Sequence, residues 1–344
     1  MLVELLKMTR PKNIVIAIIT LVVGYMLLRQ FPDPQFMAIP FEDGSGDDGA
    51  DFSPGRIILA LQMFAFAFAI GFANIQNDIL DLESDKMNRP ERPLVTGKVS
   101  VKAARRAWIS MFILMLLCGL GATILQNYGF FHLLCTARDL NYIHSLLSLD
   151  YDYDLDTLQL WFFVLLGLLL IAYNKWLKHI PLLKNMTVAF LCTTPLLFAM
   201  LYIFFDSIVF SQWAIIPAIP FAFLLTTARE IYKDLEDETG DLKAGIMTFP
   251  LIAGSATARR LAGAIIVFTW ISLPIPVFYL DKVFGHNYPP LFLIITGLTL
   301  TPTFAVILFS AHRNNYRRAQ SLTKAAMFLG LIALIICVSI KSIN

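Results

Sequence analysis

The chain has 344 residues, of which 57% are hydrophobic and only 15% are charged. Soluble domains carry about 25% charged residues, so this composition and a mean hydropathy of +0.68 exclude an ordinary soluble protein. The formal net charge is only +2, and we expect no nucleic-acid partner. The four cysteines show no Cys-x-x-Cys spacing and are expected to pack as small apolar side chains.

The apolar residues come in blocks of roughly 18–25, long enough to cross about 30 Å of hydrocarbon. The sequence therefore predicts an all-α polytopic membrane protein, with nine transmembrane helices around a central cavity. We expect residues 1–344 to form a single domain. The predicted spans lie near residues 13–31, 57–77, 103–125, 158–177, 186–206, 212–230, 260–280, 290–311 and 323–341.

The distribution of charge orients these spans. With nine crossings, 22 of the 27 lysine and arginine residues fall on the side that carries the N-terminal segment. The positive-inside rule makes that side cytoplasmic. We therefore expect an integral protein of the cytoplasmic membrane, with longer extra-cytoplasmic connections at about 32–55 and 126–156. The acidic strip near the end of the second connection lacks the spacing of an EF-hand, so we expect it to be solvated.

A first acidic segment follows the second predicted span, on the cytoplasmic side. Asn77, Asp81 and Asp85 are spaced i, i+4 and i+8, so they would share one face of a continuous helix. Asp78 would lie on the same side of that helix.

A second acidic segment follows the sixth predicted span, and its aspartates would project within about a 60° arc of a helix: Asp234, Asp237 and Asp241. Carboxylates at a membrane boundary usually mark function. Mg²⁺ would relieve their mutual repulsion, since it binds carboxylates together with phosphate oxygens. We therefore predict that both acidic segments, Asn77 and Asp78 included, bind Mg²⁺ and through it a diphosphate. The alternative is two solvated loops whose acids balance nearby lysines and arginines.

Polar and basic side chains accompany the acidic segments. Four of them either contact phosphate or lie there only because of the positive-inside bias: Arg92, Lys98, Arg229 and Lys233. Asn13, at the start of the first span, forms a hydrogen bond either to the substrate or to the end of its own helix. Tyr173 and Lys178, at the cytoplasmic end of the fourth span, are placed to reach the same space, unless the lysine only snorkels to the interface.

The first segment resembles the NDxxDxxxD motif of the UbiA superfamily of intramembrane prenyltransferases, through Asn77, Asp78, Asp81 and Asp85. The sequence that follows, Asn88–Ser100, is NRPERPLVTGKVS. It is similar to the NRPxRPxxSGxxS pattern of that superfamily, with Thr96 in place of serine.

The second segment resembles the DxxxD motif of the superfamily, through Asp237 and Asp241 preceded by Asp234. Its wider form, REIYKDLEDETGD, is most similar to the archaeal ether-lipid branch. The superfamily often shows YxxxK in the fourth span, whereas Tyr173 and Lys178 are five residues apart.

The resemblance implies a prenyltransferase that uses Mg²⁺ as cofactor. Its partners would be a prenyl diphosphate and a lipophilic acceptor, within the lipid bilayer. In the ether-lipid branch the prenyl group is geranylgeranyl and the acceptor is the free hydroxyl of geranylgeranylglyceryl phosphate. Catalytic roles are implied for Asp81, Asp85, Asp237, Asp241, Lys178 and Tyr173, and substrate-binding roles for Asn13, Asn77, Arg92, Lys98, Arg229 and Lys233. The oligomeric state is not predicted.

Other functions must be compared with this one. A prenyltransferase of quinone biosynthesis with an aromatic acceptor, or a prenyltransferase that acts on a tetrapyrrole, would share the first acidic segment. A cation-coupled transporter would also use membrane carboxylates, but transporters place them near the bilayer midplane, whereas these lie at predicted span ends. A CDP-alcohol phosphotransferase would need a DGxxAR sequence, which the chain lacks.

Overall fold

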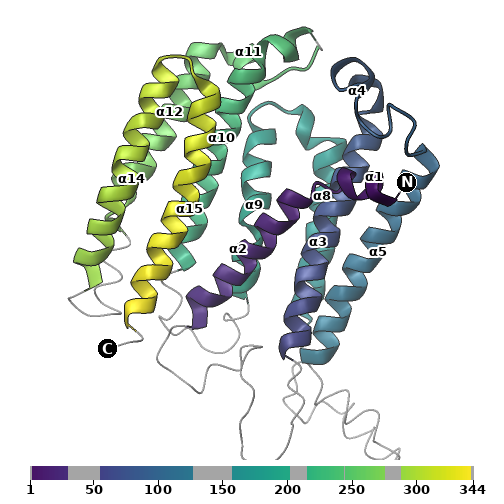
Figure 1. Cartoon of the computed structure of the whole chain (residues 1–344), viewed down its shortest axis with the longest axis horizontal. Coiled ribbons are helices and arrows are strands. Elements are labelled where there is room, and N and C mark those ends of the chain that lie inside the picture. The colour runs from purple at the N-terminus through teal and green to yellow at the C-terminus, as the bar shows by residue number, and fades with distance from the viewer. Residues whose placement is uncertain are drawn as a thin grey trace, which may run out of the picture. The chain divides into compact units, whose positions relative to one another are not determined.

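Residues 2–29, 55–126, 157–201, 215–243, 245–275 and 288–341 are described in the computed structural model. The regular structure in these ranges is entirely helical, which confirms the predicted all-α class (Figure 1). Both predicted extra-cytoplasmic connections, except for their end residues, lie outside the described residues.

Each predicted span coincides, with shifted ends, with a long helix in the described part of the chain. These helices are α2 (Pro11–Arg29), α3 (Gly55–Leu80), α5 (Val101–Gln126), α8 (Leu158–Lys175), α9 (Leu183–Leu201), α10 (Ile215–Lys243), α12 (Ser255–Ser272), α14 (Tyr288–His312) and α15 (Tyr316–Lys341). The shorter elements are α1 (Leu2–Met8), α4 (Leu82–Asn88), the 3₁₀ helix η2 (Leu177–His179) and α11 (Phe249–Ala253).

Six helices in the described ranges are long and apolar enough to cross a membrane, namely α3, α5, α8, α9, α10 and α14. Large apolar side chains such as Leu165, Phe190 and Leu298 are exposed on them, as expected for helices whose outer surface meets lipid. The first two turns of α12 and of α15 include a pair of arginines, which lowers the mean hydropathy of these helices. The count of nine spans, the central cavity and the single domain stay predictions.

The chain separates into two compact units. The described part of unit 1 comprises residues 2–14, 55–79, 96–126 and 157–171. Unit 2 comprises the remaining described residues, and includes α4, η2 and α9 to α15. Each unit has a helical interior of its own.

In unit 1, α3, α5 and α8 pack against one another through close contacts. A side chain at Gly71 of α3 would lie 2.8 Å from the sulfur of Met111 on α5. A side chain at Gly119 of α5 would likewise meet the ring of Phe163 on α8. A buried hydrogen bond of 2.9 Å joins the amides of Gln62 and Gln159, which satisfies two polar groups inside this unit.

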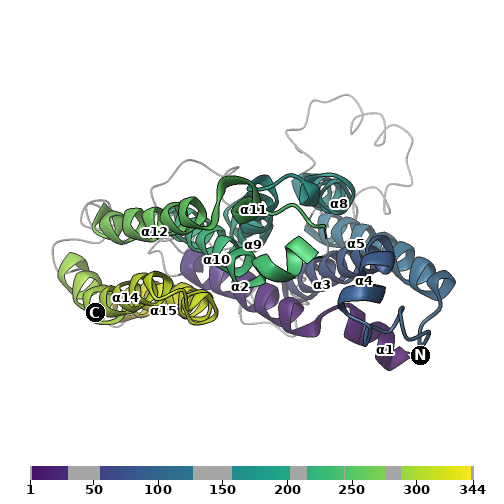
Figure 2. The same ribbon diagram turned by 90° about the horizontal axis from the view of Figure 1, so that it is seen from above.

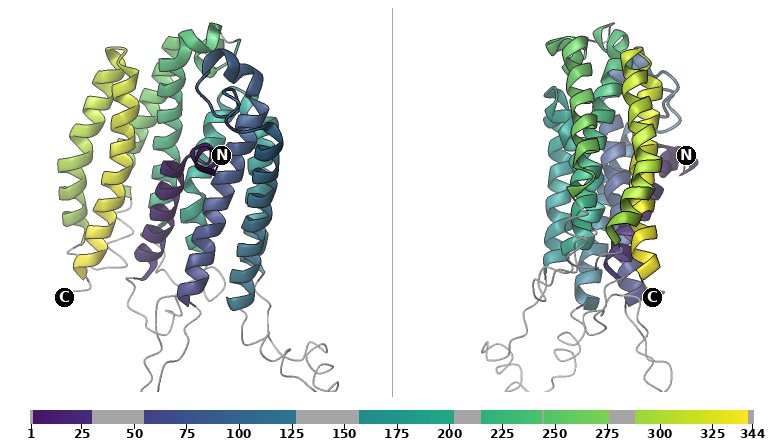
Figure 3. Two further views of the ribbon diagram at one scale, coloured as in Figure 1. Left: turned by 45° about the vertical axis from the view of Figure 1, so that its right-hand side comes forward. Right: turned by 90° about the vertical axis from the view of Figure 1, so that its left-hand side faces the viewer.

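In unit 2, α10 packs against α9, α12 and α15, and α14 packs against α12 and α15 (Figures 1 and 2). The helices α10, α12, α14 and α15 therefore form a closed four-helix bundle whose members run alongside one another (Figure 3). Helix α2 approaches α9 closely, because a side chain at Gly24 would lie 2.9 Å from the Cβ of Ala199.

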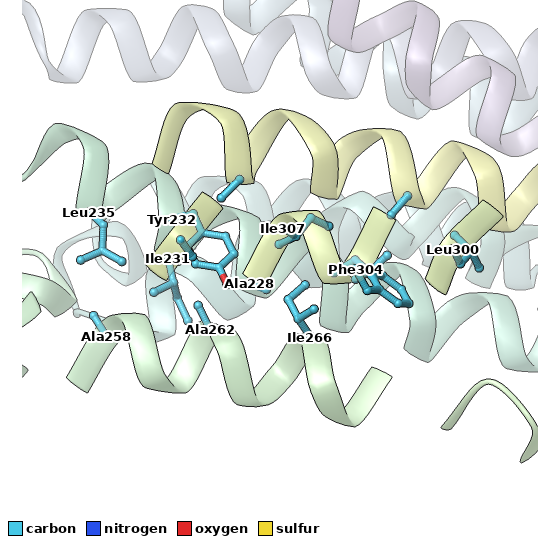
Figure 4. Packing of buried hydrophobic residues seen from close by; sticks show 14 residues of the cluster. Ala228, Ile231, Tyr232, Leu235, Ala258, Ala262, Ile266, Leu300, Phe304 and Ile307 are labelled. Carbon is cyan, nitrogen blue, oxygen red and sulfur yellow. The ribbon is translucent and has the colours of Figure 1, made fainter. Parts of the chain in front are cut away.

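The interior of this bundle joins large side chains of α10 and α14 with small residues of α12 (Figure 4). Tyr232 of α10 and Phe304 of α14 are fully buried, and Ala258 and Ala262 of α12 belong to the same buried cluster. Small residues let helix backbones approach closely, which favours packing where lipid supplies no hydrophobic driving force. The bundle holds α10, and with it the second acidic segment.

Candidate active site

The first acidic segment is not one continuous helix. Helix α3 ends at Leu80 and α4 begins at Leu82, with Asp81 between them at φ −91° and ψ 8°. Asn77, Asp81 and Asp85 therefore lie on two helices and the turn between them, and their shared face stays a prediction. Asp81 occupies the N-cap position of α4 but makes no capping hydrogen bond through its side chain. Its carboxylate accepts a hydrogen bond from a distant lysine instead, which leaves the helix start uncapped.

That lysine is Lys178, whose Nζ lies 2.6 Å from Oδ1 of Asp81. Only 10% of the lysine side chain and 33% of the aspartate side chain are exposed, so water screens this ion pair weakly. Further along the segment, the buried carboxylate of Asp85 accepts a hydrogen bond from the guanidinium of Arg92. Two of the predicted basic residues thus neutralise two of the predicted acids.

Asp78 is buried within unit 1, where its Oδ1 lies 3.2 Å from the guanidinium of Arg10. Arg10 adopts a positive φ of 56° between α1 and α2. The side-chain amide of Asn74 also donates to the carbonyl oxygen of Thr9, at 3.1 Å. The α1–α2 turn is therefore fastened to α3 by two polar contacts. The sequence analysis did not predict this role for Arg10.

In the second segment, Asp234 is held by two residues in the first turn of α9. Lys184 Nζ donates to Oδ1 at 2.8 Å, and Asn185 Nδ2 donates to Oδ2 at 3.0 Å. Asp234 and Asn185 are buried. The sequence analysis did not select Lys184 or Asn185, although two adjacent polar residues at the start of an apolar helix were a usable signal.

The short connection between α8 and α9 contacts both acidic segments. Lys178 in η2 holds Asp81, and Lys184 at the start of α9 holds Asp234. The two lysines are six residues apart in the sequence, so their Cα atoms are separated by at most about 20 Å of extended chain. All four residues belong to unit 2. One short connection therefore holds both Asp81 and Asp234, and the common cytoplasmic side of the two acidic segments stays a prediction.

The other predicted residues of α10 differ in their surroundings. Asp237 is exposed and Asp241 is half-buried, and neither makes an ion pair with another described residue. Arg229 lies 2.8 Å from the buried carboxylate of Glu230, and Lys233 lies 3.9 Å from it. The structure therefore pairs these two cations with Glu230, which the sequence analysis had not singled out.

The remaining predicted substrate contacts have varied exposure. Asn13 and Lys98 are exposed, and Asn77 and Tyr173 are half-buried near the ends of α3 and α8. Their roles toward a substrate stay predictions.

In the described part of the chain, no three His, Cys, Asp or Glu side chains are gathered closely enough to hold a metal ion. Arginine and lysine neutralise four of the aspartates there. The donor chemistry nevertheless fits Mg²⁺, because aspartate oxygens are the hard ligands that this ion prefers. Of the predicted metal-binding aspartates, Asp237 and Asp241 are the two whose carboxylates form no ion pair with a described lysine or arginine.

The described helices thus combine exposed apolar side chains with two aspartates that one short connection holds. A profile of the UbiA prenyltransferase family matches residues 48–137 and 141–332, and the chain belongs to that family. It is therefore an integral membrane prenyltransferase, which replaces the transporter alternative. The family predicted from the two motifs is confirmed.

Two relatives show how far this similarity extends. A digeranylgeranylglyceryl phosphate synthase of Methanosarcina mazei is 31% identical over 340 residues, which cover 96% of each chain. The synthase of the same name from Methanobrevibacter smithii is 26% identical over 324 residues and 94% of each chain.

Solved structures share the fold. A digeranylgeranylglyceryl phosphate synthase structure superposes with a TM-score of 0.65 and 23% identity, over 98% of both chains. A UbiA homologue from Archaeoglobus fulgidus, bound to GPP and Mg²⁺, gives a TM-score of 0.56 and 16% identity, over 98% of this chain and 99% of that one.

Proposed function

We propose that this prenyltransferase moves a geranylgeranyl group from geranylgeranyl diphosphate to the free hydroxyl of geranylgeranylglyceryl phosphate, a step of ether-lipid synthesis, with Mg²⁺ as cofactor. The observation that carries this proposal is the near full-length match to synthases of that name at up to 31% identity. The acceptor hydroxyl oxygen would form the new ether bond as the allylic bond to diphosphate breaks and the hydroxyl proton is released.

The acidic residues are proposed to hold the cation. Asp81 and Asp85 in the first segment, and Asp237 and Asp241 in the second, would supply carboxylate oxygens. The attachment of both segments to the α8–α9 connection supports this assignment. When bound, Mg²⁺ would stabilise the negative charge that develops on the leaving diphosphate.

Basic side chains beside the carboxylates would then bind the diphosphate. Lys178 and Arg92 are mostly buried and already lie against Asp81 and Asp85. They are within reach of any phosphate bound at the same carboxylates, and lysine and arginine bind phosphate oxygens through charge-assisted hydrogen bonds. The other residues proposed at the substrate site are Asn13, Asn77, Lys98, Tyr173, Arg229 and Lys233.

We also propose that the active site faces the cytoplasm and that the chain crosses the cytoplasmic membrane nine times. The excess of lysine and arginine on the side of the acidic segments supports this orientation. The prenyl chain would lie between apolar helices, where water is excluded from the reacting carbon.

The identity of the acceptor substrate distinguishes this function from prenyl transfer to an aromatic acceptor in quinone biosynthesis. Purified protein would receive geranylgeranyl diphosphate, Mg²⁺ and one of three acceptors: geranylgeranylglyceryl phosphate, 4-hydroxybenzoate or dihydroxynaphthoate. Mass spectrometry should detect a prenylated product only with the glyceryl phosphate. A prenylated aromatic product, with none from the glyceryl phosphate, would refute the proposed acceptor.

A further inference from the structure

The three aspartates of α10 are not equivalent. Both carboxylate oxygens of Asp234 accept hydrogen bonds, one from Lys184 and one from Asn185. The side chain of Asp234 is only 6% exposed. Asp237, by contrast, is exposed, and Asp241 is half-buried. A cation approaching Asp234 would have to displace a charged lysine or a buried amide.

Asn185 is placed for this contact at a cost to the fold. Because a carboxylate only accepts hydrogen bonds, the amide of Asn185 must turn its Nδ2 toward Asp234. Its Oδ1 is then buried with no hydrogen-bond donor in the described part of the chain. A leucine would occupy this position without burying an unpaired acceptor, which is unfavourable. The asparagine is thus better explained by what it holds than by the stability it adds.

The contact at Asp234 adds a polar tie to the apolar packing that holds α10 in its rotation about its own axis. Asp241 follows seven residues later, so it points within about 20° of the direction of Asp234 and about 10 Å further along the helix. Asp237 points about 60° away. A contact that ties Asp234 to α9 therefore sets the directions in which these two carboxylates project.

We infer that Lys184 and Asn185 clamp Asp234 as a positioning residue, outside the metal ligands, and so aim Asp237 and Asp241 at the cation. This inference rests on the proposed function and narrows the ligands in the second acidic segment to two. Lys184 and Asn185 act through Asp234 and do not contact the substrate.

The test measures Mn²⁺ binding by electron paramagnetic resonance on the full-length protein in detergent. Asn185→Leu changes no charge, so its effect on Mn²⁺ binding distinguishes a positioning role of Asp234 from a role as metal ligand. If the clamp positions α10, the variant binds Mn²⁺ about tenfold more weakly or worse, as for other residues that orient metal ligands. If Asp234 is itself a ligand, freeing its Oδ2 leaves Mn²⁺ binding unchanged or tightens it, and the inference is overturned.

Thr187→Val is the matched control. Thr187 is buried on the same helix, and its hydroxyl donates to the carbonyl oxygen of Leu183 at 2.8 Å. This variant should bind Mn²⁺ as the wild type does. Thermal unfolding of each variant is measured alongside, so that loss of the fold is recognised.

Lys184→Met provides a second route if Asn185→Leu does not fold. Removing a cation near the site favours Mn²⁺ in general, so Lys243→Met, which removes an exposed charge from the last turn of α10, serves as its control. The clamp predicts weaker binding in Lys184→Met than in Lys243→Met, and tighter binding would overturn it. If the wild-type protein binds Mn²⁺ but transfers no prenyl group, the proposed function is refuted and the clamp inference is not. If the wild-type protein binds no Mn²⁺, the proposed function and the clamp inference are both overturned.

Discussion

The Nζ atom of Lys178 lies 2.6 Å from Oδ1 of Asp81, a residue 97 positions earlier in the chain. The pair joins the break between α3 and α4 to the connection between α8 and α9. It brings together a predicted metal ligand and a lysine with a predicted catalytic role, two groups that the proposed reaction requires within a few ångströms of each other.

Asp81→Asn should reduce prenyl transfer by about 100- to 1,000-fold in kcat, the usual effect of removing a group that stabilises developing charge. The amide keeps the shape of the side chain and can still accept a hydrogen bond from Lys178. We therefore expect the variant to remain folded in detergent. Transfer of labelled geranylgeranyl groups and a thermal unfolding curve check both expectations, and wild-type turnover would refute the assignment of Asp81.

Asp237→Asn should lose activity to a similar extent, by about 100-fold or more. Glu236→Gln is the matched control, because Glu236 is an exposed acid on the same helix whose carboxylate accepts a hydrogen bond from Gln320. Rates of both variants are measured at saturating substrate. Equal losses in the two would mean that the net charge of α10, and not the position of Asp237, governs the reaction.

Lys178→Met should raise the KM for the prenyl diphosphate by about 10- to 100-fold, the equivalent of one hydrogen bond to a charged group. Lys86→Met is its control, since Lys86 is an exposed residue that pairs with Glu83 in the preceding turn, at 2.7 Å. Steady-state kinetics over a range of diphosphate concentrations give the comparison. An unchanged KM in Lys178→Met would remove this residue from the substrate site.

Removal of divalent cations should abolish prenyl transfer, and added Mg²⁺ should restore it. The aspartates of the two segments supply only oxygen ligands, which Mg²⁺ prefers. The protein is treated with EDTA and dialysed before the assay. Full activity after this treatment would contradict the metal-dependent mechanism.

Gly330→Ala should destabilise the four-helix bundle by about 1–3 kcal/mol, because it overpacks the contact between α15 and α10. An added Cβ would lie 2.6 Å from Cε1 of Phe221. At Gly297 of α14 an added Cβ meets no atom within 4 Å, so Gly297→Ala should keep or raise the stability. The unfolding temperatures of the two variants in detergent test this difference.

The sequence predicted the helical elements well, because long apolar blocks and the residues that interrupt them are local features. It also predicted the family, since two acidic motifs with fixed spacing lie after particular spans. It did not predict the break between α3 and α4 at Asp81, whose carboxylate accepts a hydrogen bond from Lys178, distant in the chain.

The partners of the aspartates were the least predictable part of the site. Lys184 and Asn185 contact Asp234 from about 50 positions away, and Arg10 contacts Asp78 from 68 positions away. Charge patterns along the chain indicate that cations are near, but only the packing of α9 against α10 determines which cation meets which carboxylate.

The connection between α8 and α9 has a consequence for how this protein can change in length. Insertions in an unattached surface segment cost little entropy, but one extra residue between Lys178 and Lys184 would shift one lysine away from its carboxylate. Family members that lengthen this stretch would need to replace at least one of the two ion pairs. The length of this connection therefore determines whether both carboxylates keep their lysine partners.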